Sequence, residues 1–235
     1  MDTDEKAAAK MAAEIKQLSE EIYVPRHEYR QVDSRDFRHL DLHYYDSVRD
    51  ALLAQGCHGL GDIENVTLKN SKNDPRTFIR TLASRDRDIA ISLYQPKPKI
   101  WLRLLLWIFR IKLGRVFDCE SAFSNGVFLV TSNAAMASPM KLPRNFDSKF
   151  FPFETPFETI LQSHQQRIRE FLTANPGVNP ILYHTLDDVL KMQHRQEAAK
   201  AAFRKSFGFV DEDELKKLGM DPQMATAVKR AADNR

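Results

Sequence analysis

Apolar side chains recur with helical spacing near the start of the chain, where they are separated by four, three and four residues. This spacing places them on one stripe of a helix over residues 5–22, which Pro25 would end. A stripe of about two heptads is short for a stable coiled coil, so we expect it to dock within its own chain. The stripe consists of Met11, Ile15, Leu18 and Ile22.

A second helix is predicted over residues 41–55, with Asp41 as its N-cap and Gly56 just beyond its end. After it, the pattern changes to short runs of β-branched and aromatic residues, which are typical of strands. Asn125 and Gly126 separate the last two runs, and an Asn-Gly pair in this position predicts a β-hairpin. The predicted strands cover residues 63–69, 76–83, 88–94, 115–123 and 127–132.

The chain returns to helical patterns after residue 150. Thr155 and Glu158 form a capping box with Pro156 at the first helical position, so a helix is predicted from there to Asn175. Cap patterns at residues 185–188, 211–214 and 221–222 predict further helices. The C-terminal part of the chain is therefore predicted to be helical.

These elements predict an α+β fold, with an antiparallel sheet of about five strands packed by helices and with helical N- and C-terminal extensions. A parallel sheet is disfavoured because we find no long crossover connections between the predicted strands. The predicted domains are an N-terminal helical arm over residues 1–36, a core domain over 37–174 with an insertion at 97–115, and a C-terminal helical extension over 175–235.

Composition limits the classes of protein to which this chain can belong. Its 235 residues have a mean hydropathy of −0.46, and the net charge of +3 is too small to indicate steering toward nucleic acid. The two cysteines, Cys57 and Cys119, match no metal or redox spacing and are expected to be buried thiols. The start of the chain lacks the pattern of a secretory signal, so we expect a cytoplasmic protein.

The most unusual segment is residues 97–115, KPKIWLRLLLWIFRIKLGR, which contains six cationic side chains, two tryptophans and no acid. A helix over residues 99–113 would place Lys99, Arg103 and Arg110 on one stripe of an otherwise apolar surface. Its length of about 21 Å is short of the roughly 30 Å needed to span a bilayer, but it suits a helix lying in the interface. The residues predicted to make external contacts are Lys97, Lys99, Trp101, Arg103, Leu105, Trp107, Arg110, Lys112 and Arg115.

Three environments are open for this segment: burial over a face of the sheet, contact with an anionic membrane surface, or a groove on a protein partner. Single-stranded nucleic acid is disfavoured, because a run of leucines is a poor match for a phosphate backbone. Pro96 and Pro98 favour an external contact, since they form a stiff, extended lead-in. We therefore predict a non-enzymatic module that associates with a partner or with the inner face of a membrane. An assembly protein that uses its terminal helices is a further hypothesis.

No catalytic, nucleotide-binding or metal-binding motif occurs in the sequence, so neither a cofactor nor a metal is predicted. Asp118 and Glu120 lie two residues apart on a predicted strand, where a carboxylate pair can serve acid–base chemistry, although two solvent-facing acids are the commoner arrangement. His164, on a mostly apolar helix, is interpreted as a residue at the edge of the core. Convergence of these three in a pocket between sheet and helices would favour a small hydrolase or ligand-binding domain instead.

Four stretches of the sequence carry a family resemblance, and a helix that contains His164 follows them. They read HLDLHYYDSVRDALLAQGCHGLGDIENVT, RTFIRTLASRD, SLYQPKPKIWLRLL and ESAFSNGVFLVTSNA. Over residues 37–172 the chain resembles a family of uncharacterised bacterial proteins of unknown function. The resemblance implies that this central segment is a unit and that both ends are additions. It implies no activity and no functional residue.

Overall fold

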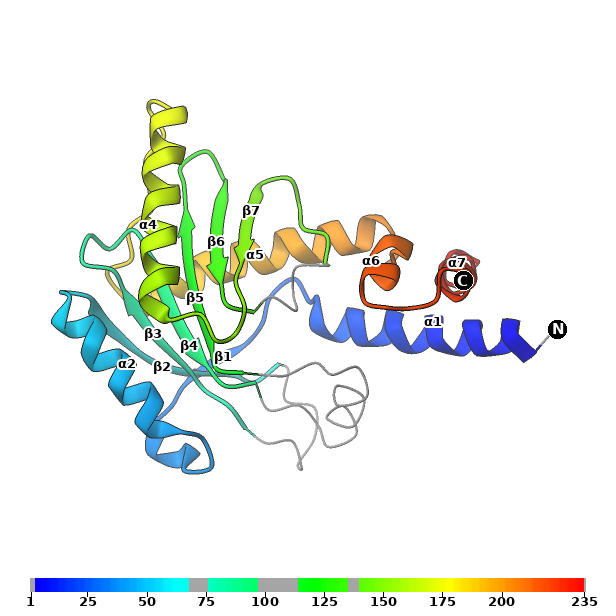
Figure 1. Cartoon of the computed structure of the whole chain (residues 1–235), viewed down its shortest axis with the longest axis horizontal. Helices are drawn as coiled ribbons and strands as arrows, with labels where there is room; N and C mark the ends of the chain where they lie inside the picture. The colour runs from blue at the N-terminus through cyan, green and yellow to red at the C-terminus, as the bar shows by residue number, and fades with distance from the viewer. Residues whose placement is uncertain (1–2, 68–75, 97–113, 135–139, 235) are drawn as a thin grey trace. The chain divides into compact units, whose positions relative to one another are not determined.

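The computed structural model describes residues 3–67, 76–96, 114–134 and 140–234 (Figure 1). The chain divides into two compact units, the larger of which comprises residues 28–138 and 144–193. The smaller unit comprises residues 1–27, 139–143 and 194–235. The two ends of the chain therefore belong to the same unit, although they are far apart in sequence.

A seven-stranded sheet forms the larger unit, with its strands in sequence order from β1 to β7. Neighbouring strands are antiparallel from β1 to β6, whereas β7 runs parallel to β6. The predicted α+β class is therefore confirmed. The strands are β1 (Tyr29–Gln31), β2 (His58–Asn65), β3 (Ile79–Ala83), β4 (Ala90–Tyr94), β5 (Val116–Ala122), β6 (Phe128–Ser132) and β7 (Phe146–Phe150).

Both edge strands are absent from the prediction, so the expected number of about five strands was too low. Strand β1 has only three residues, Tyr-Arg-Gln, and these show no apolar alternation. Strand β7 lies parallel to β6 because residues 133–145 provide a connection long enough for the chain to return in the same direction. Strands β2 to β6 overlap the predicted runs, although β2 begins at His58, earlier than expected.

Helices α2 (Leu42–Ala54) and α4 (Phe157–Ala174) cover one face of the sheet, in front of it in Figure 1. We call this the α2–α4 face; it carries Arg80 and Leu82 of β3 and Phe78 just before that strand, because alternate residues of an extended chain point to the same side. The main apolar core lies here. Its fully buried members include Phe37, Tyr45, Leu52, Phe78, Leu82, Ile91, Leu93, Phe117, Phe123 and Ile160.

The opposite face carries a smaller apolar cluster. Val189 and Met192, from the beginning of helix α5 (Leu186–Ser206), pack there with Tyr183 and with small residues of the sheet, so we call it the α5 face. Ala83, Ala90 and Ala122 are the small residues in contact. Helical residues thus cover both faces of the sheet, and not one face alone.

The predicted Asn-Gly hairpin joins β5 to β6. Phe123 and Val127 flank a three-residue loop. The Phe123 amide donates to the Val127 carbonyl at 3.0 Å and closes the loop. Gly126 has φ = 84°, in the left-handed region where a side chain is unfavourable. The prediction from sequence is confirmed because this turn depends mainly on its own residues.

We expect Gly126→Ala to destabilise the larger unit by about 1 kcal/mol, because alanine pays the steric cost of the left-handed conformation. The measurement is urea denaturation followed by circular dichroism. Gly59→Ala serves as a matched control, since Gly59 has no positive φ and an added Cβ would meet no atom within 4 Å. Equal losses of stability in the two variants would contradict the expectation.

Most predicted helix caps are present. The Asp41 side chain accepts from the Tyr44 amide at 3.1 Å at the start of α2, and Asp211 accepts from the Glu214 amide at 3.1 Å. The capping box at Thr155 was wrong, because α4 begins at Phe157 and no side chain caps it. Pro156 itself occupies the cap position with an extended backbone, which leaves Thr155 one residue too early.

In the smaller unit, α1 (Thr3–Ile22) packs against α7 (Pro222–Asp233). An apolar cluster lies between these helices and also includes Leu215 of α6 (Glu212–Lys217). Met11 and Ile15 of the predicted stripe contact this cluster, which confirms that the stripe docks within the chain. Leu18 and Ile22 remain exposed. The buried members of the cluster are Ala8, Ala12, Val210, Leu215, Ala225 and Val228.

Candidate functional site: a polar groove at the edge of the sheet

A groove of about 580 Å³ lies at the edge of the sheet, where β1 ends beside β2. Residues 31–34 line it as the chain leaves β1 for the short helix η1 (Ser34–Phe37), and Arg49 of α2 lines it as well. Strands β2 and β3 contribute Asp62 and residues 80–82. We take this groove as the candidate functional site because it combines a cavity of ligand size with buried charged groups.

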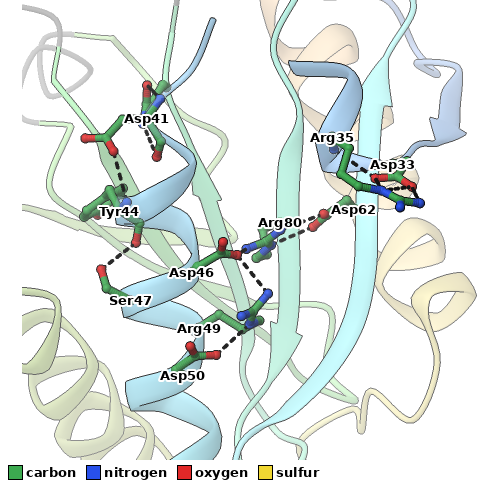
Figure 2. A network of polar contacts seen from close by, with 11 residues as sticks. Asp33, Arg35, Asp41, Tyr44, Asp46, Ser47, Arg49, Asp50, Asp62 and Arg80 are labelled. Atoms are coloured by element: carbon green, nitrogen blue, oxygen red, sulfur yellow. Dashed lines mark hydrogen bonds and ion pairs between the residues drawn. The ribbon is translucent and has the colours of Figure 1, made fainter. Parts of the chain in front are cut away.

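Arg80 is the most deeply buried charged residue of the groove, with 7% of its side chain exposed. Its Nε and Nη2 donate to the two carboxylate oxygens of Asp62, each at 2.9 Å, and its Nη1 donates to Oδ1 of Asp46 at 2.6 Å. Figure 2 shows Arg80 between the helix that carries Asp46 and the strand that carries Asp62. A buried guanidinium requires such partners, because an unpaired interior charge is costly.

Asp46 joins Arg80 to a second guanidinium. The same Oδ1 accepts from Nη1 of Arg49 at 2.8 Å, while Nε of Arg49 donates to Asp50 at 2.8 Å (Figure 2). Arg49 and Asp50 follow Asp46 by three and four positions. All three residues therefore lie on one side of α2. This side of α2 therefore carries charges of both signs next to the groove.

Ion pairs shift the pKa values of Arg80 and Asp33 in the directions that favour their charged forms. Burial lowers the pKa of Arg80, but the hydrogen bonds to Asp62 and Asp46 have the larger combined effect, so that pKa is raised above its ordinary value. At the rim, the guanidinium of Arg35 hydrogen-bonds to Asp33 and lowers the pKa of that carboxyl to about 2. The groove consequently presents fixed charges of both signs.

A second buried carboxylate lies two residues further along β2. The side chain of Glu64 is 2% exposed and accepts from Nη2 of Arg30 at 2.7 Å and from Nε of Arg76 at 2.7 Å. Asp62, Glu64 and Arg80 were not predicted from the sequence, because charged residues in a strand normally face solvent. Acids at alternate positions of one strand, followed by arginines in the next, are the signal that would have indicated them.

Asp118 and Glu120 share one face of β5, as their spacing predicted, but they do not face solvent. Both lie on the α5 face, where Tyr94 Oη donates to Asp118 Oδ2 at 2.9 Å and Gln193 Nε2 donates to Glu120 Oε2 at 2.5 Å. Burial and the charge of Asp118 raise the pKa of Tyr94, so its hydroxyl remains a donor. The expectation of two exposed acids was therefore wrong, because α5 covers this side.

His164 lies on the other face of the sheet and is fully buried, not at the edge of the core. Its Nε2 is 3.0 Å from Ser121 Oγ and its Nδ1 is 2.8 Å from Thr131 Oγ1. The Ser121 hydroxyl donates to the Asp88 carbonyl at 2.5 Å, so it must accept from His164 Nε2–H. The ring is then neutral, with Nδ1 accepting from the hydroxyl of Thr131.

This hydrogen-bond network does not suit His164 for acid–base catalysis. Thr131 Oγ1 also accepts from Nη1 of Arg167 at 2.6 Å, which leaves its own proton for the imidazole. Burial, together with the positive charge of Arg167, lowers the pKa of His164 to about 3. Since His164 lies opposite Asp118 and Glu120, the three weak catalytic candidates do not converge in one site. The hydrolase alternative therefore gains no support from these three residues.

Most of the predicted contact segment lies outside the described residues. Trp101 and Trp107 belong to this part, as do Lys97, Lys99, Arg103, Leu105, Arg110 and Lys112. Arg115 is described: its guanidinium pairs with the Asp41 carboxylate and lies 4.5 Å from the centre of the Tyr44 ring. Arg115 is thus held by α2, while about half of its side chain remains exposed.

Both cysteines are free and buried, as predicted, and burial raises the pKa of the Cys119 thiol. A search of the described residues finds no group of three His, Cys, Asp or Glu side chains suited to a metal. Within the same residues, none of the helices has both the length and the apolar character needed to cross a membrane.

Comparison of the chain with protein-family models, with curated proteins and with solved structures finds no match. The resemblance to a bacterial family that residues 37–172 suggest therefore stays a prediction.

Proposed function

We propose that this chain is a non-enzymatic module that attaches to an anionic membrane surface through residues 97–115. The proposal rests on the place of this segment in the fold. Tyr94 at the end of β4 pairs directly with Val116 at the start of β5, so the ladder between these strands is complete without the segment. An acid-free, basic and apolar stretch of 19 residues is thus inserted between two paired central strands.

Both ends of the insertion are tied to the beginning of α2. The amide of Asp41 donates to Gln95 Oε1 at 3.2 Å, and the Asp41 carboxylate pairs with Arg115. The carbonyl of Gln95 accepts from Thr77 Oγ1 at 2.9 Å, and the carbonyl of Arg115 accepts from Asn133 Nδ2 at 2.9 Å. A firmly held base is suited to presenting an insertion to an external surface.

The composition of the insertion favours a lipid surface over a protein groove. Arg115 is engaged by Asp41, so we assign the contacts with lipid phosphates to the cations from Lys97 to Lys112. Each cation near an anionic leaflet contributes about 1 kcal/mol. Each apolar side chain that is fully buried adds about 1.5–3 kcal/mol. Together these contributions are enough for reversible binding, and tryptophan is favoured at headgroup depth.

The test is co-sedimentation of the full chain with liposomes. Binding should rise with the fraction of anionic lipid and fall with added salt, because exposed charges are screened. Replacing both Trp101 and Trp107 with serine should lower the partition at least about tenfold, since two buried apolar side chains are lost. The unfolding temperature should remain that of the unchanged protein.

A matched control replaces two exposed leucines of the larger unit, Leu53 and Leu182, with serine. This control should bind liposomes as the unchanged protein does. A tryptophan double variant that unfolds at a much lower temperature would show that the segment belongs to the core and would refute the proposal. Absence of liposome binding would refute it too, and would leave a protein partner as the explanation of the segment.

A further inference from the structure

The groove beside β2 borders an unpaired edge of the sheet. Strand β1 pairs with residues 63–65, and the last bond at its C-terminal end joins the Val32 amide to the Asp62 carbonyl at 3.0 Å. Beyond that point, Gly59 and Gly61 pair with β3 on one side, and no described residue forms a backbone hydrogen bond with them on the other. Such an edge is a template for an added extended chain.

Glycine keeps this edge accessible. A Cβ added at Gly59 would meet no atom within 4 Å, so open space adjoins the strand there. Gly61 has φ = 142°, and the chain bulges between Gly59 and Gly61. A bulge at an edge normally interrupts pairing, and here it lies within the groove lining. Gly59 therefore leaves room for a second backbone to approach β2, whereas a Cβ at Gly61 would lie 3.5 Å from Leu186 Cδ2 and 3.7 Å from Gln31 Nε2.

The two arginines of the groove retain donor hydrogens. A guanidinium has five N–H groups. Among the described residues, Arg80 donates three hydrogen bonds and Arg49 donates two, so each has hydrogens to spare. Both side chains line the groove, and a guanidinium matches the planar geometry of a carboxylate. These donors fit a carboxylate ligand.

The charge balance selects among anions. The lining holds Arg49, Arg80, Asp33 and Asp62, and Asp46 bonds both arginines from α2, so carboxylates already balance the two guanidinium charges. A carboxylate ligand brings one negative charge to this site, whereas a phosphate dianion brings two and would meet the stronger repulsion from these aspartates.

We propose that this groove binds the carboxyl-terminal residues of a short, extended peptide. Its terminal carboxylate takes the spare hydrogens of Arg49 and Arg80, and its backbone pairs with the open edge of β2 at Gly59. Three extended residues span about 10 Å, and the groove has the volume of an ordinary ligand site. Val32 and Leu82 supply an apolar surface for a side chain of the peptide. This site is independent of the membrane segment.

The test is isothermal titration of the full chain with tripeptides of the form Ala-Ala-X, where X covers apolar, polar and charged residues. At least one member should bind, and its C-terminal amide should bind about tenfold or more weakly because charge-assisted hydrogen bonds are lost. Methylation of the central peptide nitrogen should also weaken binding, since it removes a donor needed for pairing with β2. Inorganic phosphate should not compete.

Two variants test the site without disturbing the core. Arg49→Gln should weaken binding about tenfold, because this arginine is partly exposed and donates to the carboxylate. Gly59→Val should block the edge while the protein remains folded, since the added side chain enters open space. Arg169→Gln on α4 is the matched control, an exposed helical arginine that bonds Gln166 and lies outside the groove lining.

Several results would overturn the proposal. No binding by any tripeptide, or equal affinity for the acid and the amide, would exclude capture of a carboxylate. Phosphate that competes with the peptide would indicate a general anion site instead. Unchanged affinity of Arg49→Gln or Gly59→Val would place the peptide elsewhere. Because none of these measurements involves lipid or residues 97–115, their failure is separate from failure of the membrane proposal.

Discussion

Arg204→Met is expected to destabilise the smaller unit by about 3–5 kcal/mol, because it leaves a buried carboxylate without its cation. Arg204, on α5, has 2% of its side chain exposed and donates from Nη1 to Glu214 Oε2 at 2.6 Å. Its Nη2 also donates to the Lys141 carbonyl at 3.0 Å, and the guanidinium lies 4.8 Å from the centre of the Tyr23 ring. One side chain thus connects four segments of the unit.

The measurement is hydrogen exchange followed by mass spectrometry, with urea denaturation of the full chain. Amides of α1, α6 and α7 should lose protection in Arg204→Met, while the sheet of the larger unit should keep it. The additional change Glu214→Gln should restore most of the loss, since it removes the buried charge and keeps an acceptor for the Lys141 amide.

An exposed ion pair on the same helix provides the matched control. Lys191 and Asp187 are 2.6 Å apart and both side chains are about 70% exposed. Lys191→Met should therefore change stability by less than about 1 kcal/mol. If Arg204→Met were no more harmful than this control, the buried pair would contribute little and the expectation would be wrong.

His164 is expected to make the larger unit sensitive to mild acid. The pKa of the folded residue is lowered to about 3 by burial and by Arg167, while an unfolded histidine has a pKa of about 6.5. Between these values the unfolded chain binds more protons, so the free energy of unfolding falls as the pH falls. The contribution is fully present above about pH 6.5 and decreases by about 1.4 kcal/mol per pH unit below it.

The test compares the pH dependence of urea denaturation for the unchanged protein and for His164→Gln. Glutamine offers one donor and one acceptor, as the neutral ring does for Ser121 and Thr131. Between pH 6.5 and pH 5 the unchanged protein should lose about 2 kcal/mol more than the variant. Parallel curves for the two proteins would mean that His164 does not account for the acid sensitivity.

Elements with strong local signals were predictable from sequence. The α2 cap at Asp41 and the turn at Gly126 depend on residues within a few positions of themselves. The central strands were identified because their apolar runs are long enough to be recognised without knowledge of their partners. By contrast, β1 and β7 are short edge strands, and each exists because a neighbouring strand provides hydrogen bonds for it.

The candidate site was much less predictable. Its residues come from the end of β1, from α2, from β2 and from β3, and no single segment has a recognisable motif. Arg80 was not selected because a lone arginine in a strand normally faces solvent, whereas here Asp46 and Asp62 make its burial tolerable. The pairing of Asp62 with Arg80 can be recognised only once β2 and β3 are known to be neighbouring strands.

The sequence by itself determined the α+β class, the helix starts at the aspartate caps, the hairpin, and an acid-free insertion between two strands. Periodicity, capping and turn formation act over a few residues, so they are visible without a structure. Only the tertiary structure decided that His164 and Asp118 occupy opposite faces, that the two ends of the chain share one unit, and that Arg80 lies buried beside an open strand edge. These features depend on which elements pack together, and packing is decided by contacts between residues that are distant in sequence.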